Sequence, residues 1–381
     1  MRYMYLILVI FLVSLNLRPS ITSVGPLFDI IQSNLGMSGV TVSLMTTLPV
    51  LCMGIFAVLA IKLNSHLGIE KSLLAAMLLI LTATSLRVFA NGSLFLITTS
   101  LFTGIGIGIA GPLISGFIKK HFPNKPGITG VYSVAMVIGA AIASSFSVPL
   151  FHKLNESWQY SLGFWGILAL PASLLLLPLL KKKETNRTVI PISSLFVKNK
   201  RVLLFTLFFG CMAAIFYSIT AWLAPIAQSI GLSYSQSGLV LTLFTVIQIP
   251  ISFFIPMLVS KTGRRKTWLL VCGLSELIGI VFLLLHFSPW FAAVFLGIGA
   301  GGLFPLAILI PIQEAKSAEE ATSLSAVMQF GGYLLGSIGP LFIGFTSDLF
   351  DNFAPALAML MIIIFILLAA SLKIGDKKET V

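Results

Sequence analysis

The sequence predicts an all-α membrane protein with twelve transmembrane helices in two pseudo-symmetric six-helix halves. Three observations support this prediction. The 381 residues are 57% hydrophobic and only 9% charged, whereas soluble domains carry about 25% charged residues. The apolar residues gather in runs long enough for the roughly 20 residues that cross a bilayer. Sequence blocks in the first half of the chain also recur in the second half at a nearly constant offset.

Loops that contain Gly, Pro, Asn or charged residues separate the apolar runs, and each run is expected to form one helix. The first run follows Arg2 and has no small-residue cleavage site, so we interpret it as an uncleaved transmembrane helix. Several runs exceed 25 residues, which implies tilt or extension beyond the hydrocarbon. The expected helices span residues 4–32, 38–61, 72–90, 94–118, 127–150, 159–180, 201–229, 235–259, 267–286, 290–313, 320–346 and 353–372.

The charge distribution predicts the orientation. A net charge of +12 would suggest a nucleic-acid partner in a soluble protein, but these cations lie in short loops, so none is expected. With the N-terminus inside, 21 of the 24 Lys and Arg residues fall on the cytoplasmic side. Only Arg87 and Lys153 fall outside, and Arg18 remains within a helix. This asymmetry predicts a multi-pass protein of the cell membrane with both termini in the cytoplasm.

Three ordered blocks repeat at offsets of 192 to 195 residues, which predicts an internal duplication. They are Leu35–Ser38 with Ile230–Ser233, Gly104–Leu113 with Gly297–Leu306, and Ser133–Gly139 with Ser325–Gly331. We therefore expect two halves in the same orientation, residues 1–180 and 201–381, joined by a basic cytoplasmic linker, residues 181–200. Parallel halves around a central cavity are an architecture of secondary transporters.

The loop after the eighth expected helix, residues 256–266, resembles the major facilitator loop signature G-x-L-x-D-R-x-G-R-R. Pro256 replaces the first Gly and Ser260 replaces the Asp. Because the acid is missing, we expect Arg264 to find its partner elsewhere, at a helix C-terminus. The candidate gating residues are Lys261, Gly263, Arg264 and Arg265.

A narrower resemblance covers nearly the whole chain. The segments Leu15–Pro26, Gly301–Ala307 and Leu324–Leu335 are similar to the cyanate permease and nitroimidazole transporter family within the major facilitator superfamily. The resemblance implies the major facilitator fold and transport of a small solute by alternating access. It also implies that the third, sixth, ninth and twelfth helices are peripheral.

Arg18 is the main candidate for substrate binding. It lies roughly 20 Å along the first expected helix at about 1.5 Å per residue, and an Arg at the bilayer centre costs between about 2.5 and 17 kcal/mol. It must therefore face a partner or a watery cavity. Pro19 has no N–H, so the Leu15 carbonyl loses its helical hydrogen-bond partner. An unpaired backbone carbonyl at membrane depth is tolerated where it contacts other protein groups or water. The planar guanidinium suits small planar anions or dipolar solutes. The alternative is a structural Arg held by carbonyls or a buried acid.

In a continuous first helix, Arg18 would share one polar face with Ser14, Thr22, Gly25 and Asp29. Asn16 and Thr22 are further binding candidates on this helix. The second half offers polar and aromatic candidates on its seventh, eighth and eleventh helices. The alternative for these residues is hydrogen bonding between helices, worth about 0.6 kcal/mol each, or an interfacial position for the Trp. These candidates are Tyr217, Trp222, Gln248, Gln329 and Tyr333.

Glu276 is the candidate for proton coupling, because it is the carboxylate nearest the middle of an expected helix. Its ninth helix is expected to be peripheral, so the alternative is a protonated Glu hydrogen-bonded to a neighbouring helix. Three cysteines lie far apart within apolar runs and lack metal-binding spacing, so core packing is expected. They are Cys52, Cys211 and Cys272.

The leading function is secondary transport of a small solute, with a coupled proton as a further partner, by a monomer that needs no cofactor. A multidrug exporter with an apolar aromatic cavity is the first rival, because the chain has 30 Phe residues. The central Arg18 argues against a cationic drug. A membrane enzyme is a rival from another class, but the sequence has neither G-x-S-x-G nor H-E-x-x-H.

Overall fold

The computed structural model describes residues 2–37, 39–123, 125, 127–181, 200–350 and 352–376. These residues are helical and contain no strand. By length and composition, eleven described helices can cross a membrane, and a bent helix pair makes a twelfth if it is counted as one span. This confirms the predicted fold class. Most of the expected linker, residues 182–199, lies outside the described residues.

The chain forms two compact units. Unit 1 comprises Met1–Pro123, Ala135–Ile192 and Ala315–Phe330, and unit 2 comprises Asn124–Val134, Ser193–Glu314 and Gly331–Val381. Two long helices therefore divide between the units. These are α8 (Ile128–Lys153) and α16 (Ala318–Phe350).

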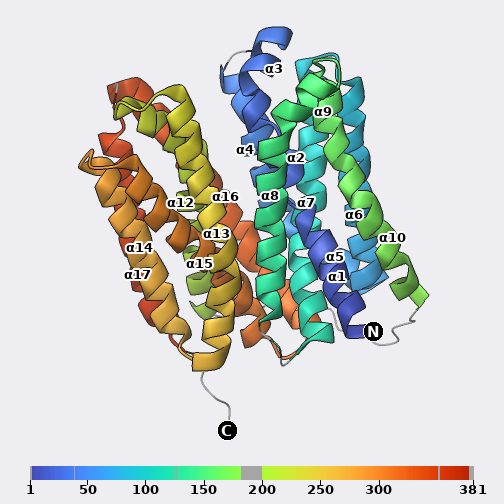
Figure 1. Ribbon diagram of the computed structural model, residues 1–381. Helices are drawn as coiled ribbons and strands as arrows, with labels where there is room; N and C mark the ends of the chain where they lie inside the picture. The colour runs from blue at the N-terminus through green and yellow to red at the C-terminus, as the bar shows by residue number, and fades with distance from the viewer. Residues whose placement is uncertain are drawn as a thin grey trace. The chain divides into compact units, whose positions relative to one another are not determined.

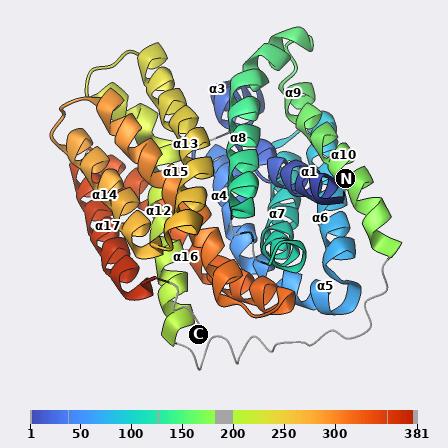
Figure 2. The same ribbon diagram turned by 60° about the horizontal axis from the view of Figure 1, so that its bottom comes forward.

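Unit 1 is built around α7 (Ser93–His121), which packs against α4 (Gly39–Ala57) and α6 (Ile69–Ser85). On its other side, α6 packs against α10 (Ala169–Leu176), which also contacts α1 (Arg2–Leu15), as Figures 1 and 2 both show. The remaining elements of this unit are short. They are α2 (Pro19–Thr22), η1 (Gly25–Leu27), α3 (Phe28–Leu35), α5 (Leu59–Leu67), η2 (Leu86–Phe89), α9 (Trp158–Phe164), η3 (Trp165–Leu168) and η4 (Leu177–Lys181).

Unit 2 is built around α15 (Pro289–Glu314), which packs between α13 (Tyr234–Thr262) and α14 (Arg265–Leu284). The last helix, α17 (Ala354–Ile374), covers α14 and α12 (Lys200–Ser229). Figure 1 shows α14 and α17 side by side in orange and red. The arrangement repeats that of unit 1, where α7 packs between α4 and α6.

The first expected helix is not continuous, which corrects the sequence prediction of one helix over residues 4–32. The helix α1 ends at Leu15, and α2 begins at Pro19 after a turn. Within that turn, the Asn16 and Leu17 amides donate to carbonyls only three residues back. Pro19 explains the break, because it has no N–H and disfavours a helical conformation of the preceding residue. The predicted polar face from Ser14 to Asp29 therefore does not exist as one helical stripe.

The second expected helix is also broken. The helix α4 ends at Ala57, and α5 continues to Leu67 at an angle of 51°. The sixth expected helix, residues 159–180, is likewise interrupted by the 3₁₀ segment η3, and it ends in the 3₁₀ segment η4. Sequence periodicity does not detect such breaks, because the apolar run continues through each of them.

The repeated glycines make equivalent contacts in the two units. A Cβ on Gly108 would lie 2.8 Å from the Met53 Cα of α4, and a Cβ on Gly301 would lie 2.9 Å from the Gln248 Cα of α13. Such distances are too short for a side chain, so glycine is required for the close approach of the helix backbones. The internal duplication predicted from the sequence thus corresponds to a duplication of helix packing.

Candidate functional site

Arg18 lies at the break in the first span. It is the N-cap of α2, immediately before a Pro at the first helical position, which is a favoured place for Pro. Its carbonyl accepts hydrogen bonds from the Ile21 and Thr22 amides at 3.0 Å. Only 7% of Arg18 is exposed. The structure therefore places a nearly buried Arg side chain beside an interruption of the helix.

The other two candidates on this span make local contacts. The Asn16 side-chain amide donates to the Leu12 carbonyl at 2.7 Å and to the Leu168 carbonyl at 2.9 Å. It thereby ties the turn before Arg18 to η3. The half-buried Thr22 donates from Oγ1 to the Arg18 carbonyl at 3.1 Å. Both side chains thus stabilise the local geometry of the break that holds Arg18.

Gln329 lies in the part of α16 that belongs to unit 1. Its Nε2 donates to Ser325 Oγ at 2.9 Å, and that hydroxyl pairs with Ser115 Oγ of α7 at 3.1 Å. A Cβ on Gly111 would lie 2.6 Å from Gln329 Oε1. The amide of Gln329 therefore covers the glycine-rich face of α7.

Tyr217 and Tyr333 belong to one aromatic cluster in unit 2. Their ring centroids are 6.2 Å apart, and Tyr333 also packs edge-on against Phe209 at 5.1 Å. Tyr217 in turn packs against Phe216 at 5.3 Å. The structure thus brings together these two sequence candidates, one on α12 and one on α16.

Trp222 and Gln248 are engaged with backbone carbonyls in unit 2. Trp222 Nε1 donates to the Pro340 carbonyl at 3.0 Å. Gln248 Nε2 donates to the Phe244 carbonyl, one turn back on α13, also at 3.0 Å. The indole N–H of Trp222 and one side-chain amide N–H of Gln248 are thus already hydrogen-bonded within unit 2.

Glu276 lies in the seam between α14 and α15 and is only 1% exposed. Its Cγ occupies the space over Gly299, where an added Cβ would overlap it. Its Oε2 has no hydrogen-bond partner in the described part of the chain. A buried ionised carboxylate without a partner is costly, so this environment favours the neutral carboxylic acid.

In the candidate gating loop, Gly263 ends α13 in the left-handed conformation, with φ of 67°. This conformation favours glycine, since a Cβ destabilises it. The side chains of Lys261 and Arg264 are exposed, and Arg264 is the N-cap of α14.

Arg265, rather than Arg264, has its partners at helix C-terminal ends. It is 1% exposed. Its Nη2 lies 2.9 Å from Glu314 Oε1, its Nη1 donates to Gln313, and its Nε donates to the Gly375 carbonyl. Arg201 Nη2 also contacts Glu314, at 3.1 Å. The expected pairing at a helix C-terminus is therefore made by the residue after Arg264. Adjacent side chains point in different directions, so Arg264 itself is exposed.

The sequence analysis missed Arg87, which it placed outside the membrane as a loop cation. Arg87 lies in η2 and is fully buried. Its Nη1 donates to the Ser20 carbonyl of α2 at 2.6 Å, and its Nη2 donates to Ser100 Oγ of α7 at 3.0 Å. One signal in the sequence could have indicated a buried position. Arg87 is one of only two cations assigned to the outer side of the membrane, where cations are otherwise absent from the predicted loops.

The chain is similar in sequence and in fold to known proteins. Residues 6–340 match the model of the Major Facilitator Superfamily. An uncharacterized transporter of Bacillus subtilis (strain 168), YycB, is 32% identical over 96% of this chain and 92% of its own length. Two proteins of Escherichia coli (strain K12) are 29% identical: the cyanate transport protein CynX, over 91% of both chains, and the 2-nitroimidazole transporter, over 97% of this chain and 95% of its own length.

Solved structures share the fold at low sequence identity. The transporter FucP in its outward conformation superposes with a TM-score of 0.76 at 14% identity, covering 98% of this chain and all of that chain. The proton:xylose symporter XylE gives 0.79 at 13% identity, covering 98% and 96%. The chain belongs to the Major Facilitator Superfamily, which confirms the resemblance found in the sequence.

Proposed function

We propose that the protein is a secondary transporter for a small, planar, anionic or strongly dipolar solute of the cyanate or nitroimidazole kind. The observation that carries this proposal is Arg18, nearly buried at the break of the first span. A guanidinium presents five donors in a planar fork, which matches a planar anion or a nitro group. The names of two full-length relatives, a cyanate transport protein and a 2-nitroimidazole transporter, support the same class of solute.

The remaining sequence candidates are proposed as secondary contributors. In unit 1, Asn16 and Thr22 hold the break, and Gln329 offers an amide on α16. In unit 2, Tyr217 and Tyr333 offer an aromatic surface, Trp222 lies on the same helix as Tyr217, and Gln248 lies on α13. We propose that alternating access exposes the bound solute first to one side of the membrane and then to the other.

The proposed setting is the cell membrane, with a monomer whose termini lie in the cytoplasm. The asymmetry of Lys and Arg between the two sides supports this orientation. Glu276 is the proposed site for a coupled proton, because its carboxyl is buried and Oε2 has no partner in the described residues.

Uptake into proteoliposomes tests the proposed function. Labelled cyanate and 2-nitroimidazole are compared with a panel of larger anions and with a bulky organic cation. We expect saturable uptake of at least one small planar solute, loss of that uptake in Arg18→Gln, and retention in Lys153→Gln, which removes an exposed cation. Uptake of the bulky cation alone would instead support the multidrug alternative.

A further inference from the structure

The buried Arg87 has no acidic partner in the described part of the chain. Its guanidinium donates hydrogen bonds to two neutral oxygens, the Ser20 carbonyl and Ser100 Oγ. Its Nε is buried without a hydrogen-bond partner. Ser100 Oγ donates to the Leu96 carbonyl, which leaves its lone pairs to accept from Arg87 and fixes the guanidinium. The positive charge is therefore held in place but is not neutralised by a described residue.

Other unsatisfied polar atoms lie close to Arg87 and its partners along the chain. Ser20 Oγ and Ser23 Oγ, one turn apart beside α2, are buried and have no described hydrogen-bond partner. Thr84 Oγ1, one turn before Arg87, is in the same state. Native proteins rarely leave buried polar groups unsatisfied, so each such group calls for an explanation. Here the group consists of one N–H and three hydroxyls, all able to donate.

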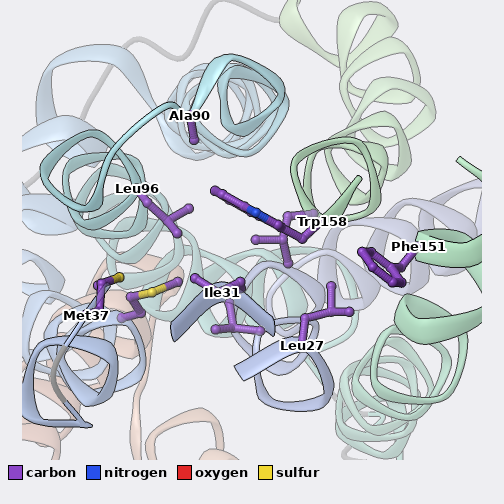
Figure 3. Close-up of a cluster of buried hydrophobic side chains, with 10 residues drawn as sticks. Leu27, Ile31, Met37, Ala90, Leu96, Phe151 and Trp158 are labelled. Carbon is purple, nitrogen blue, oxygen red and sulfur yellow. The ribbon is translucent and has the colours of Figure 1, made fainter. Parts of the chain in front are cut away.

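An apolar cluster adjoins these polar residues along the chain. Val24, Ala90 and Leu96 each lie within about one helical turn of Ser23, Arg87 or Ser100, and all three belong to a buried cluster that includes Leu27 and Trp158. Figure 3 shows Ala90, Leu96 and Trp158 facing one another in this cluster. Apolar packing lowers the local dielectric, which increases the cost of an uncompensated charge.

We propose that Arg87, Ser20, Ser23 and Thr84 bind a small monovalent anion inside unit 1, with Ser100 positioning the guanidinium. Each of these side chains is at most 2% exposed, so the site lies away from bulk water. Water would satisfy the free donors but would leave the charge of Arg87 uncompensated. The site uses other side chains than Arg18 and does not depend on the proposed substrate.

Anion-dependent melting of the purified full-length protein tests the proposal. Sodium bromide replaces sodium gluconate at constant ionic strength, and the melting temperature is recorded at each step. A ligand that binds the folded state raises the melting temperature in a saturable way. We expect a saturable rise in the wild type, in Lys153→Gln and in Arg18→Gln, and its loss in Arg87→Gln.

Two milder variants keep the test decisive if Arg87→Gln does not fold. Ser23→Ala and Thr84→Val retain Arg87 and remove one hydroxyl each, and we expect each to raise the bromide concentration at half-saturation several-fold. The proposal is overturned if the wild type has no saturable rise, if Arg87→Gln retains it, or if neither milder variant changes it. Loss of the rise in Arg18→Gln alone would assign the anion to Arg18. None of these results depends on whether cyanate or nitroimidazole is transported.

Discussion

Glu276 lies directly against Gly299, and the two residues fill one position in the seam between α14 and α15. In unit 1, Ile80 packs against Gly106 in the matching place between α6 and α7. The duplicated architecture thus has an apolar side chain in one copy and a carboxyl in the other. Ile80 fills this position in unit 1, so close packing against the glycine does not require an acidic side chain. We therefore infer that the carboxyl of Glu276 has a functional role.

Glu276→Gln should separate transport from proton coupling. Gln has nearly the same volume and imitates the protonated acid, so we expect the variant to fold and to take up solute down its own gradient. Stimulation by an inward pH gradient should be lost, because an amide cannot release a proton. The measurement is uptake into proteoliposomes with and without the pH gradient. Undiminished stimulation in the variant would leave Glu276 as a packing residue.

The glycine contacts predict a paired effect in the two units. Gly108→Ala and Gly301→Ala each place a methyl group within 3 Å of the facing helix backbone, so each should destabilise its unit by about 1–3 kcal/mol. Gly238→Ala is the matched control, because nothing lies within 4 Å of its Cβ and Ala is the better helix former by about 1 kcal/mol. The melting temperature of the control should equal or exceed that of the wild type, and the melting temperatures of the other two variants should be lower. Equal melting of all three variants would contradict the packing described here.

Neighbouring arginines should differ sharply in their contribution to stability. Among the described residues, Arg265→Gln leaves Glu314 with the partly exposed Arg201 as its ion-pair partner. We expect a loss of about 3 kcal/mol, the lower end of the range for a broken buried pair. Arg264→Gln removes an exposed charge and should change stability by less than about 0.5 kcal/mol. Chemical denaturation of both variants, compared at one pH, is the measurement, and equal losses would refute this assignment.

Cysteine labelling tests the orientation proposed from the charges. The native cysteines are buried and free, so they provide a low background. We expect an impermeant thiol reagent to label Lys153→Cys in intact cells, and to label Thr185→Cys only after the membrane is opened. The reverse pattern would place the termini outside the cell.

The close-packed parts of the fold were predictable from the sequence. Gly104 and Gly108 recur as Gly297 and Gly301 in the repeated blocks, and small residues at this spacing allow helix backbones to approach closely. The break before Pro19 was not predicted, although the missing N–H of Pro was recognised. Hydropathy alone does not reveal that a chain resumes as a separate short helix.

The buried charges could not be placed from the sequence. Arg87 ends an apolar run, and a hydropathy pattern cannot tell whether the next helices cover such an end or leave it in water. Arg264 and Arg265 are adjacent in the loop motif, and only the packing of α14 against the ends of α15 and α17 distinguishes them. The burial and the partners of these arginines therefore depend on contacts between distant parts of the chain, which residue type and spacing do not reveal.

The central claim is that Arg18 binds the transported solute. A hydrogen bond to a charged group contributes about 1.5–3 kcal/mol, and about 1.4 kcal/mol corresponds to a factor of ten in affinity. Arg18→Ala should therefore weaken binding roughly 10–100-fold, and Arg18→Lys should recover little of it if the contact uses the planar fork. Gln329→Ala should weaken binding less than Arg18→Ala does.

The most direct test is a binding isotherm of the purified Arg18→Ala variant, measured with whichever of cyanate or 2-nitroimidazole the wild type takes up. Thermal melting first establishes that the variant is folded. The account predicts a dissociation constant at least tenfold above that of the wild type. A folded variant that binds the solute with wild-type affinity would contradict the account and leave Arg18 as a structural residue at the break of the first span.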